Sequence, residues 1–240
     1  RDDVESRGLG DVYKRQLLVM ICLGVIILLC WEAGEHLKDK ILRSLETAAE
    51  ARTGKQTVVL DSGHGGSDSG KVGINGAKEK EINLLIAKEI RRLLEKEKIE
   101  VIMVREKDEE LGKSKVEDLK YRVSLMNEKK PSLAVSIHQN SYHEENVFGA
   151  QVFYYKTSTE GEKAAAVIQE ALQEVNPENT KKIKANDTYY LLKKTEVPTV
   201  IVECGFLSNY AEAEKLVSED YQKKLAEAVT KGILQYLKDQ

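Results

Sequence analysis

Cysteine is scarce in this 240-residue chain, and its placement excludes disulfide bonds within the main part of the chain. Two of the three cysteines, Cys22 and Cys30, lie in an apolar N-terminal stretch, which leaves Cys204 alone in the remainder. A single cysteine has no partner for an internal disulfide. The fold must therefore depend on its apolar core, and a chain of this length with 41% hydrophobic residues has room for one sizeable core plus an appendage.

An excess of positive charge is also absent. The chain carries 37 Lys and Arg against 40 Asp and Glu, for a net charge of −3. Domains that bind nucleic acid usually show a basic excess on one face. Nucleic acid is therefore not an expected partner, and neither internal repeats nor low-complexity segments are present.

Long hydrophobic runs are absent apart from residues 17–31, which contain no charge. This run is shorter than the ~20 residues that usually span a bilayer, and no clear small-residue cleavage site follows it. We predict an uncleaved membrane anchor, with a cleaved export signal as the alternative. Lys14 and Arg15 precede the run and Glu32 follows it, which predicts a cytoplasmic N-terminus and a main domain outside the membrane. The protein is thus expected to be exported, either anchored or secreted.

Composition divides the chain into four segments. Residues 1–16 are hydrophilic without periodicity and are predicted to be a non-native or disordered start. Residues 17–31 are the transmembrane or signal segment. Residues 32–55 are rich in charge, with apolar side chains at helical spacing, and are predicted to be a charged helical linker. Residues 56–240 form the main domain.

Strand-like and helix-like patterns alternate through the main domain. Strands are predicted from residue 58 and over 100–105, 133–138, 150–155, 188–193 and 197–204. Helices are predicted over 79–98, before Pro131, over 160–174, over 210–216 and over 221–236. The alternation predicts a single α/β domain, with a mostly parallel, twisted sheet of about six strands covered by helices on both faces.

Polar side chains stand where three of the apolar strands end. His64 follows the first strand, His138 follows the strand from residue 133, and Glu203 ends the last strand. In open α/β sheets, sites assemble at the carboxyl edge of the strands. Two imidazoles with carboxylates there indicate a hydrolytic zinc site, in which three protein ligands leave the fourth position to water.

Two carboxylates have open roles at this edge. Glu79 begins a helix after a glycine-rich loop, where it either binds the metal or complements the helix dipole. Glu203 lies in an apolar strand and must be paired, protonated or functional, because burying an uncompensated charge is costly. Beside a metal it would serve as a base. Cys204 as a thiol nucleophile is disfavoured, because neighbours on a strand point to opposite faces.

Four motifs resemble, in order and spacing, those of the zinc-dependent N-acetylmuramoyl-L-alanine amidases of peptidoglycan turnover. They are LDSGHGG at 60–66, GAKEK at 76–80, SIHQN at 136–140 and VECGFLSN at 202–209. The resemblance covers residues 56–238. It implies zinc-dependent hydrolysis of the amide bond between N-acetylmuramic acid and L-alanine of the stem peptide.

The same resemblance implies roles for individual residues. The implied zinc ligands are His64, Glu79 and His138, and the implied catalytic carboxylate is Glu203. Substrate contacts are expected from Asn140, Gly65 and Gly66. Ser62 stands where the family usually has proline, a position that affects turn rigidity rather than ligation, so activity is expected to survive.

Within these 240 residues the chain lacks the helical insertion that covers the active site of autoinhibited members, and it lacks wall-binding repeats. This minimal form, with REKD at 105–108 and QNSY at 139–142, is most similar to the germination-specific amidases of endospore formers. That similarity implies a role in spore cortex maturation and germination through muramic lactam formation.

Two other functions remain open at this point. One is a zinc peptidase acting on peptidoglycan peptides, and the other is a non-catalytic peptidoglycan-binding relative, which would be expected to lack a ligand or the glutamate. Peptidoglycan is the expected partner, together with the membrane through residues 17–31. The sequence leaves open whether an activator protein is required.

Overall fold

The computed structural model describes residues 20–21, 23–24, 27–28, 30–42 and 56–240. The described residues up to 42 are helical and exposed. No helix in this described part of the chain is both long enough and apolar enough to cross a membrane. The predicted start at 1–16 lies outside the described residues, as do parts of the predicted anchor and linker, so these three assignments stay predictions.

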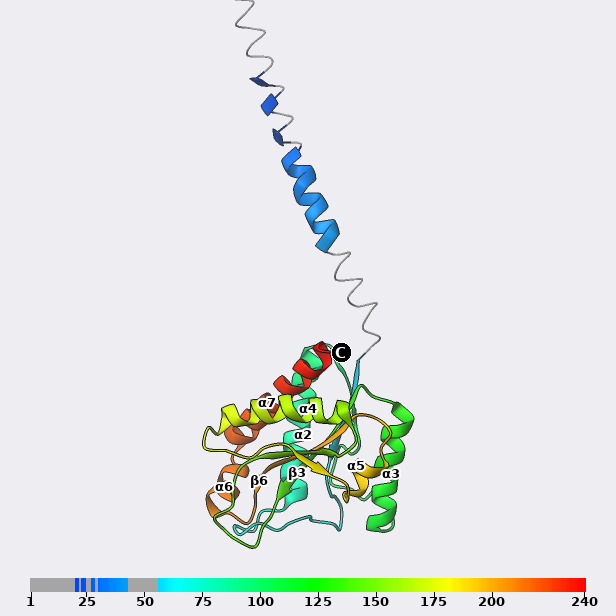
Figure 1. Cartoon of the computed structure of the whole chain (residues 1–240), viewed down its shortest axis with the longest axis vertical. Helices are drawn as coiled ribbons and strands as arrows, with labels where there is room; N and C mark the ends of the chain where they lie inside the picture. The colour runs from blue at the N-terminus through cyan, green and yellow to red at the C-terminus, as the bar shows by residue number, and fades with distance from the viewer. Residues whose placement is uncertain (1–19, 22, 25–26, 29, 43–55) are drawn as a thin grey trace, which may run out of the picture. The chain divides into compact units, whose positions relative to one another are not determined.

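Residues 56–240 form an α/β unit around a six-stranded sheet (Figure 1). The strands are β1 (Thr57–Ser62), β2 (Glu100–Met103), β3 (Leu133–Asn140), β4 (Gln151–Tyr155), β5 (Lys184–Asn186) and β6 (Thr199–Phe206). Their order across the sheet is β2-β1-β3-β6-β4-β5. All neighbouring pairs are parallel except β4 and β6, which are antiparallel. The predicted α/β fold with a mostly parallel six-stranded sheet is confirmed.

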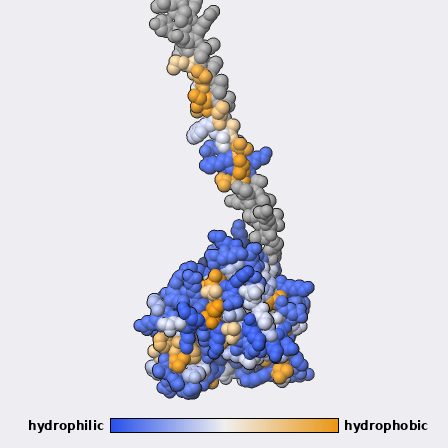
Figure 2. Space-filling view, in the orientation of Figure 1, coloured by the Kyte–Doolittle hydropathy of each residue, from blue (hydrophilic) through white to orange (hydrophobic). Residues whose placement is uncertain are grey.

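Helices cover both faces of the sheet. One face packs against α2 (Glu79–Lys96), α4 (Thr159–Val175) and α7 (Glu219–Lys238). The other packs against α3 (Lys115–Lys129) and α5 (Tyr190–Lys194), while α6 (Tyr210–Leu216) follows β6. In Figure 1, α4 and α7 run side by side, and α3 and α5 lie together away from them. The outer surface visible in Figure 2 is mostly hydrophilic, with small separate hydrophobic patches.

Side chains along the central strands point alternately to the two faces of the sheet and so form two apolar cores. Val58 and Leu60 of β1 lie in the larger core under α2, α4 and α7, whereas Val59 lies in the smaller core under α3 and α5. The same period of two separates neighbours on β6. Cys204 is buried in the larger core, and Glu203 lines a cavity on the side of α3 and α5. Their predicted opposite orientation is confirmed.

The strand predicted over residues 188–193 is wrong. This stretch contains the beginning of the one-turn helix α5, and the short strand β5 ends just before it. Leu191 and Leu192 are both buried in the smaller core, which adjacent residues of a strand cannot do because they point to opposite faces. The side chain of Asn186 closes the turn, since its Oδ1 accepts hydrogen bonds from the backbone N–H groups of Thr188 and Tyr189.

Candidate metal centre

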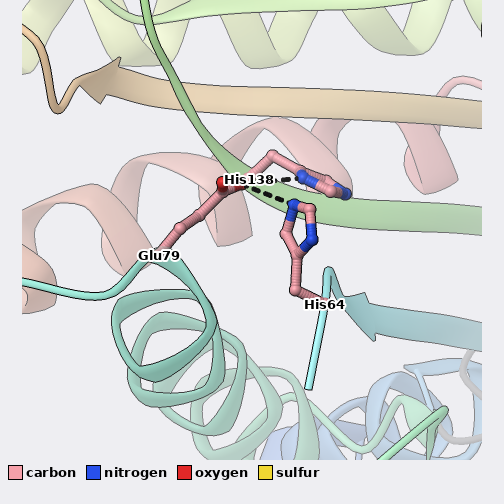
Figure 3. A group of neighbouring side chains, drawn as sticks. All are labelled: His64, Glu79 and His138. Carbon is pink, nitrogen blue, oxygen red and sulfur yellow. Dashed lines mark hydrogen bonds and ion pairs between the residues drawn. The ribbon is translucent and has the colours of Figure 1, made fainter. Parts of the chain in front are cut away.

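Three side chains from different elements converge at the carboxyl edge of the sheet. His64 follows β1, Glu79 is the first residue of α2, and His138 lies in β3. Figure 3 shows both imidazole rings beside the Glu79 carboxylate, whose Oε1 lies 3.2 Å from His64 Nε2 and 2.9 Å from His138 Nδ1. One ligand atom from each residue lies within 4.8 Å of the other two. The structure thus brings together the three residues that the motifs indicated.

The donor set and its surroundings fit a zinc ion. Two imidazole nitrogens and a carboxylate oxygen form a ligand set that hydrolytic zinc sites use, and tetrahedral ligands of zinc stand about 3.3 Å apart. Two glycines permit the close approach of the ligands. A Cβ atom on Gly63 would lie 2.1 Å from His138 Cε1, and one on Gly70 would lie 2.6 Å from Glu79 Oε2. No larger residue fits at either position without displacing a ligand.

Backbone N–H groups hold the Glu79 carboxylate in place. Its Oε2 accepts a hydrogen bond from Lys71 N at 2.7 Å, and its Oε1 accepts one from Gln139 N at 3.0 Å. Burial raises the pKa of Glu79, but hydrogen bonds from His138 and His64 outweigh it and hold the pKa well below its usual range. Glu79 is therefore an ionised carboxylate at neutral pH, which is the form that binds a metal.

The backbone of His64 is held in an unusual conformation. Its φ of 64° lies in the left-handed region, which residues with a side chain seldom adopt. Two buried guanidinium groups fix this loop. Arg122 donates to the carbonyl of His64 at 2.8 Å, while Arg105 donates to the carbonyls of Ser62 and Gly63 at 2.9 and 3.1 Å. Strained backbone persists where its surroundings determine it in this way, typically at functional sites.

The charge of Arg122 is balanced inside the domain by Asp61 and Asp118, both of which accept hydrogen bonds from its guanidinium. Asp61 is 1% exposed and also accepts a hydrogen bond from Ser136 Oγ at 2.6 Å. Burial raises the pKa of Asp61, but the charge of Arg122 and the hydrogen bond from Ser136 hold the pKa below its ordinary value. An ionised pair therefore supports the loop that carries His64.

Asp68 orients the ring of His64. Its Oδ2 lies 2.9 Å from His64 Nδ1, which leaves Nε2 on the side of Glu79. Asp68 is itself held by Gly70 N at 3.2 Å and by Lys115 Nζ at 3.0 Å. A carboxylate on one imidazole nitrogen is the usual partner of a histidine that binds metal through the other nitrogen.

We expect Asp68→Asn to weaken zinc binding by about 10–100-fold, the usual effect of removing such a partner. The fold should be retained, because the Asp68 side chain is 28% exposed and takes no part in either core. Competition with a chromogenic chelator measures the dissociation constant. Lys115→Ala is the matched control, because it removes only the exposed contact from Lys115 to Asp68 and should change the zinc dissociation constant far less. Equal dissociation constants for Asp68→Asn and the parent would contradict the orienting role of Asp68.

Glu203 faces the three candidate ligands from the next strand. It pairs with His138 in the register of β3 and β6, and it is 8% exposed. Its Oε2 has no hydrogen-bond partner among the described residues. Burial raises the pKa of Glu203 to about 7, with His138 lowering it and Glu79 raising it to smaller extents. A carboxyl group that titrates near neutral pH is suited to take up and release a proton.

The cavity beside these residues has a volume of about 780 Å³ and runs over the sheet between the start of α3 and α5. This volume is in the range of small-molecule sites. Asn140 and Gly65, two of the predicted substrate contacts, line it, and Gly66 does not. The N–H groups of Gly65 and Gly66 donate to Asp68 O and to Asp108 Oδ1, at 3.0 and 2.8 Å. Substrate contacts from these three residues stay predictions.

Sequence reasoning did not find the residues that hold the ligands. Arg105 and Arg122 are each 2% exposed. Of these two, only Arg105 has a local sequence pattern that indicates burial, because it directly follows an apolar strand. The sequence also gives no sign of the role of Asn83 in α2, whose Nδ2 donates a hydrogen bond to Gly63 O at 3.1 Å. Asp68 gave a weaker signal, since a carboxylate four residues after a candidate ligand histidine can reach its ring.

Ser62 carries a buried hydroxyl, fully shielded from solvent, with no hydrogen-bond partner among the described residues. We expect Ser62→Ala to raise the free energy of unfolding by about 1 kcal/mol, because an unsatisfied buried polar group is destabilising. Urea unfolding of the metal-free chain provides the measurement. Ser136→Ala is the matched control and should destabilise, because the hydroxyl of Ser136 donates to Asp61. A loss of stability in Ser62→Ala would show that its hydroxyl has a partner.

Comparison with known proteins identifies the family. The model of the N-acetylmuramoyl-L-alanine amidase family, Amidase_3, matches residues 58–235. This chain belongs to that family. The germination-specific N-acetylmuramoyl-L-alanine amidase of Bacillus subtilis (strain 168) is 39% identical in an alignment of 187 positions that covers 75% of this chain and 78% of that protein. The protein is thus a peptidoglycan amidase, as the four motifs indicated.

Solved structures agree with this assignment. The CwlD amidase from Clostridioides difficile, determined in complex with the GerS lipoprotein, is 37% identical with a TM-score of 0.74, over 77% of this chain and 100% of that chain. The catalytic domain of the amidase CwlV from Bacillus (Paenibacillus) polymyxa var. colistinus is 31% identical with a TM-score of 0.69, over 77% of this chain and 99% of that chain. Both likenesses confirm the predicted fold of the amidase domain.

Proposed function

We propose that this amidase is zinc-dependent and cleaves the bond between the lactyl carbonyl of N-acetylmuramic acid and the amine of L-alanine. The observation that carries the proposal is one cavity that contains two histidines, an ionised glutamate and a separate carboxyl group, that of Glu203, whose Oε2 has no hydrogen-bond partner among the described residues. His64, Glu79 and His138 would hold the zinc ion, which would supply Lewis-acid polarisation of the scissile carbonyl and would make water more acidic.

The residues of the chain divide the remaining work. Glu203 takes the proton of the attacking water and later donates it to the departing amine of L-alanine, and a pKa near 7 suits both transfers. Asp68 holds the tautomer of His64 through Nδ1. Arg105 and Arg122 keep the loop between β1 and His64 in position.

Digestion of purified sacculi by the full chain with added zinc tests this function. Mass spectrometry should detect stem peptides with a free N-terminal L-alanine. Products cut within the peptide would instead indicate a zinc peptidase, and an absence of products would fit a non-catalytic relative. Elemental analysis should show that His64→Ala and His138→Ala each strip the metal; full zinc in both variants would overturn the ligand assignment.

The biological setting that we propose is the spore cortex, with formation of muramic lactam during cortex maturation. Two likenesses support it, the germination-specific amidase at 39% identity and the CwlD amidase at 37% identity. Muropeptide analysis of spores tests it. Spores that lack this protein should contain cortex without muramic lactam, and the parent chain, but not the Glu203→Gln variant, should restore it. Normal muramic lactam in the deletion strain would exclude the cortex role.

Anchoring through residues 17–31, with the catalytic domain outside, is part of the same proposal. The basic residues before this run and the acidic residues after it support that orientation. Protease added to intact protoplasts should digest the domain. Protection of the domain would reverse the topology, and release of a shortened soluble chain would favour a cleaved signal.

A lipoprotein partner completes the proposal, supported by the solved complex of the CwlD amidase with the GerS lipoprotein. The full chain mixed with the purified lipoprotein from its own organism should elute as one complex on size exclusion and should digest sacculi faster than the chain alone. Separate elution at micromolar concentrations, with unchanged activity, would argue against an activator of this kind.

A further inference from the structure

Tyr189 presents an aromatic ring to the catalytic cavity and takes no part in the metal centre. It lines the cavity together with Glu203 and is 38% exposed. Its hydroxyl makes no hydrogen bond within the described part of the chain, although its ring is partly shielded from solvent. Burial, followed by the negative charge of Glu203, raises the pKa of Tyr189, which agrees with a position close to the proposed catalytic carboxylate.

The position of Tyr189 is fixed by the protein. Asn186 Oδ1 accepts hydrogen bonds from the backbone N–H groups of Thr188 and Tyr189, both at 2.8 Å. The ring of Phe153, which is buried in β4, lies 5.5 Å from the Tyr189 ring at an angle of 48°. Aromatic pairs at this separation attract one another. The ring is therefore held at the wall of the cavity before any substrate enters, which lowers the entropic cost of using it as a binding surface.

Charge distinguishes the two ends of the cavity. The carboxyl groups of Glu203 and Glu79 line the same cavity as Tyr189, and the charge of Glu203 acts on the Tyr189 phenol. The lysines that line the cavity come from the loop after β1 and from the start of α3, and none comes from α5: Lys71, Lys113 and Lys115. At the α3 end Asp68 pairs with Lys115, Asp118 pairs with Arg122, and Glu110 accepts a hydrogen bond from Ser67 N, which leaves Lys71 and Lys113 as the cavity lysines without an ion pair among the described residues.

We propose that Tyr189 is the saccharide-recognition residue of the proposed amidase, with its ring packed against the pyranose ring of the N-acetylmuramoyl group. The stem peptide carries carboxylates, which the cavity lysines of the loop after β1 and of the start of α3 would attract. The muramoyl ring is uncharged once its lactyl carboxyl is in the amide bond. It offers C–H groups to an aromatic face and hydroxyl groups to the free phenol. With the scissile carbonyl at the metal ligands, the sugar then lies over Tyr189 and the peptide runs toward α3.

Two substrates with the same stem peptide test this inference, which rests on the proposed amidase function. One carries the N-acetylmuramoyl group and the other carries only a lactyl group on L-alanine. In the full chain, Tyr189→Ala should lower kcat/KM for the muramoyl peptide roughly tenfold, chiefly through KM, as expected for the loss of one aromatic contact. It should leave the lactyl peptide unchanged. Tyr189→Phe should retain most of the activity, and zinc content should equal that of the parent.

Tyr121→Ala is the matched control, because Tyr121 is 45% exposed on α3 and does not line the cavity. If Tyr189→Ala unfolds, Tyr189→Leu provides the same comparison, since leucine keeps apolar contact with Phe153. Equal losses on both substrates, or no loss on the muramoyl peptide, would overturn the saccharide role. If the parent cleaves neither substrate, the proposed amidase function is wrong. Isothermal calorimetry then measures the affinity of the muramoyl peptide for the parent and for Tyr189→Ala. Equal affinities would overturn the saccharide site.

Discussion

Glu203→Gln is expected to hold zinc at the parental level and to lose about 10²–10⁴-fold in the rate of hydrolysis, the usual contribution of a positioned acid–base group. Glutamine keeps the shape of the side chain but cannot take a proton. Glu203 lies opposite His138 in the register of the sheet, and its unpaired Oε2 leaves no protein partner to be lost among the described residues. Zinc content by elemental analysis and turnover of muropeptides are the two measurements.

Cys204→Ala is the matched control for that variant. Cys204 is the neighbour of Glu203 on β6, yet it is buried in the larger core, and burial raises the pKa of its thiol. The control should therefore cost much less activity than Glu203→Gln. Loss of zinc in Glu203→Gln would indicate that Glu203 is a metal ligand, and the role of Glu79 would then need to be revised. Full activity would indicate that another group acts as the base.

The candidate ligands were predictable because each has a local signal. His64 and His138 both follow apolar runs, and parallel strands place their carboxyl ends at one edge of the sheet. The local pattern left the role of Glu79 ambiguous between metal ligation and helix stabilisation, because a glutamate in the first turn of a helix is already favoured by the helix dipole. In the structure it begins α2 and also contacts both imidazoles, so the two explanations hold together.

The support of the ligands was not predictable, because its contacts join residues far apart in the chain. Arg105 and Arg122 donate to backbone carbonyls 42 to 60 residues away, and carbonyls have no sequence signature. The error over residues 188–193 has a related cause. Tyr189 to Leu192 are apolar or aromatic and fit a short strand, and only the side chain of Asn186 and the packing under β4 and β6 select one helical turn.

Arg122→Met is expected to lower the free energy of unfolding by about 3–5 kcal/mol at neutral pH, because it leaves a buried carboxylate without its countercharge. Arg122 and Asp61 are 2% and 1% exposed. In the parent, the depressed pKa of Asp61 contributes stability above about pH 4 that is lost as the pH falls through the folded-state pKa. Without Arg122, burial raises that pKa, so the variant should lose stability as the pH rises from about 4. Urea unfolding across this range gives the measurement.

Two further variants separate charge from packing in this prediction. Asp61→Asn combined with Arg122→Met should recover much of the stability at neutral pH, since no unpaired charge remains and Ser136 can still donate to the amide oxygen. Arg92→Met removes an exposed arginine whose one ion pair among the described residues is with Glu89 on α2, and it should change the unfolding midpoint little. The gap between Arg122→Met and the parent should narrow as the pH falls from 7 toward about 4, because Asp61 of the variant is then protonated in the folded state. A gap of the same size at every pH would mean that lost packing and the carbonyl contacts to Ser62 and His64, rather than the Asp61 charge, account for the role of Arg122.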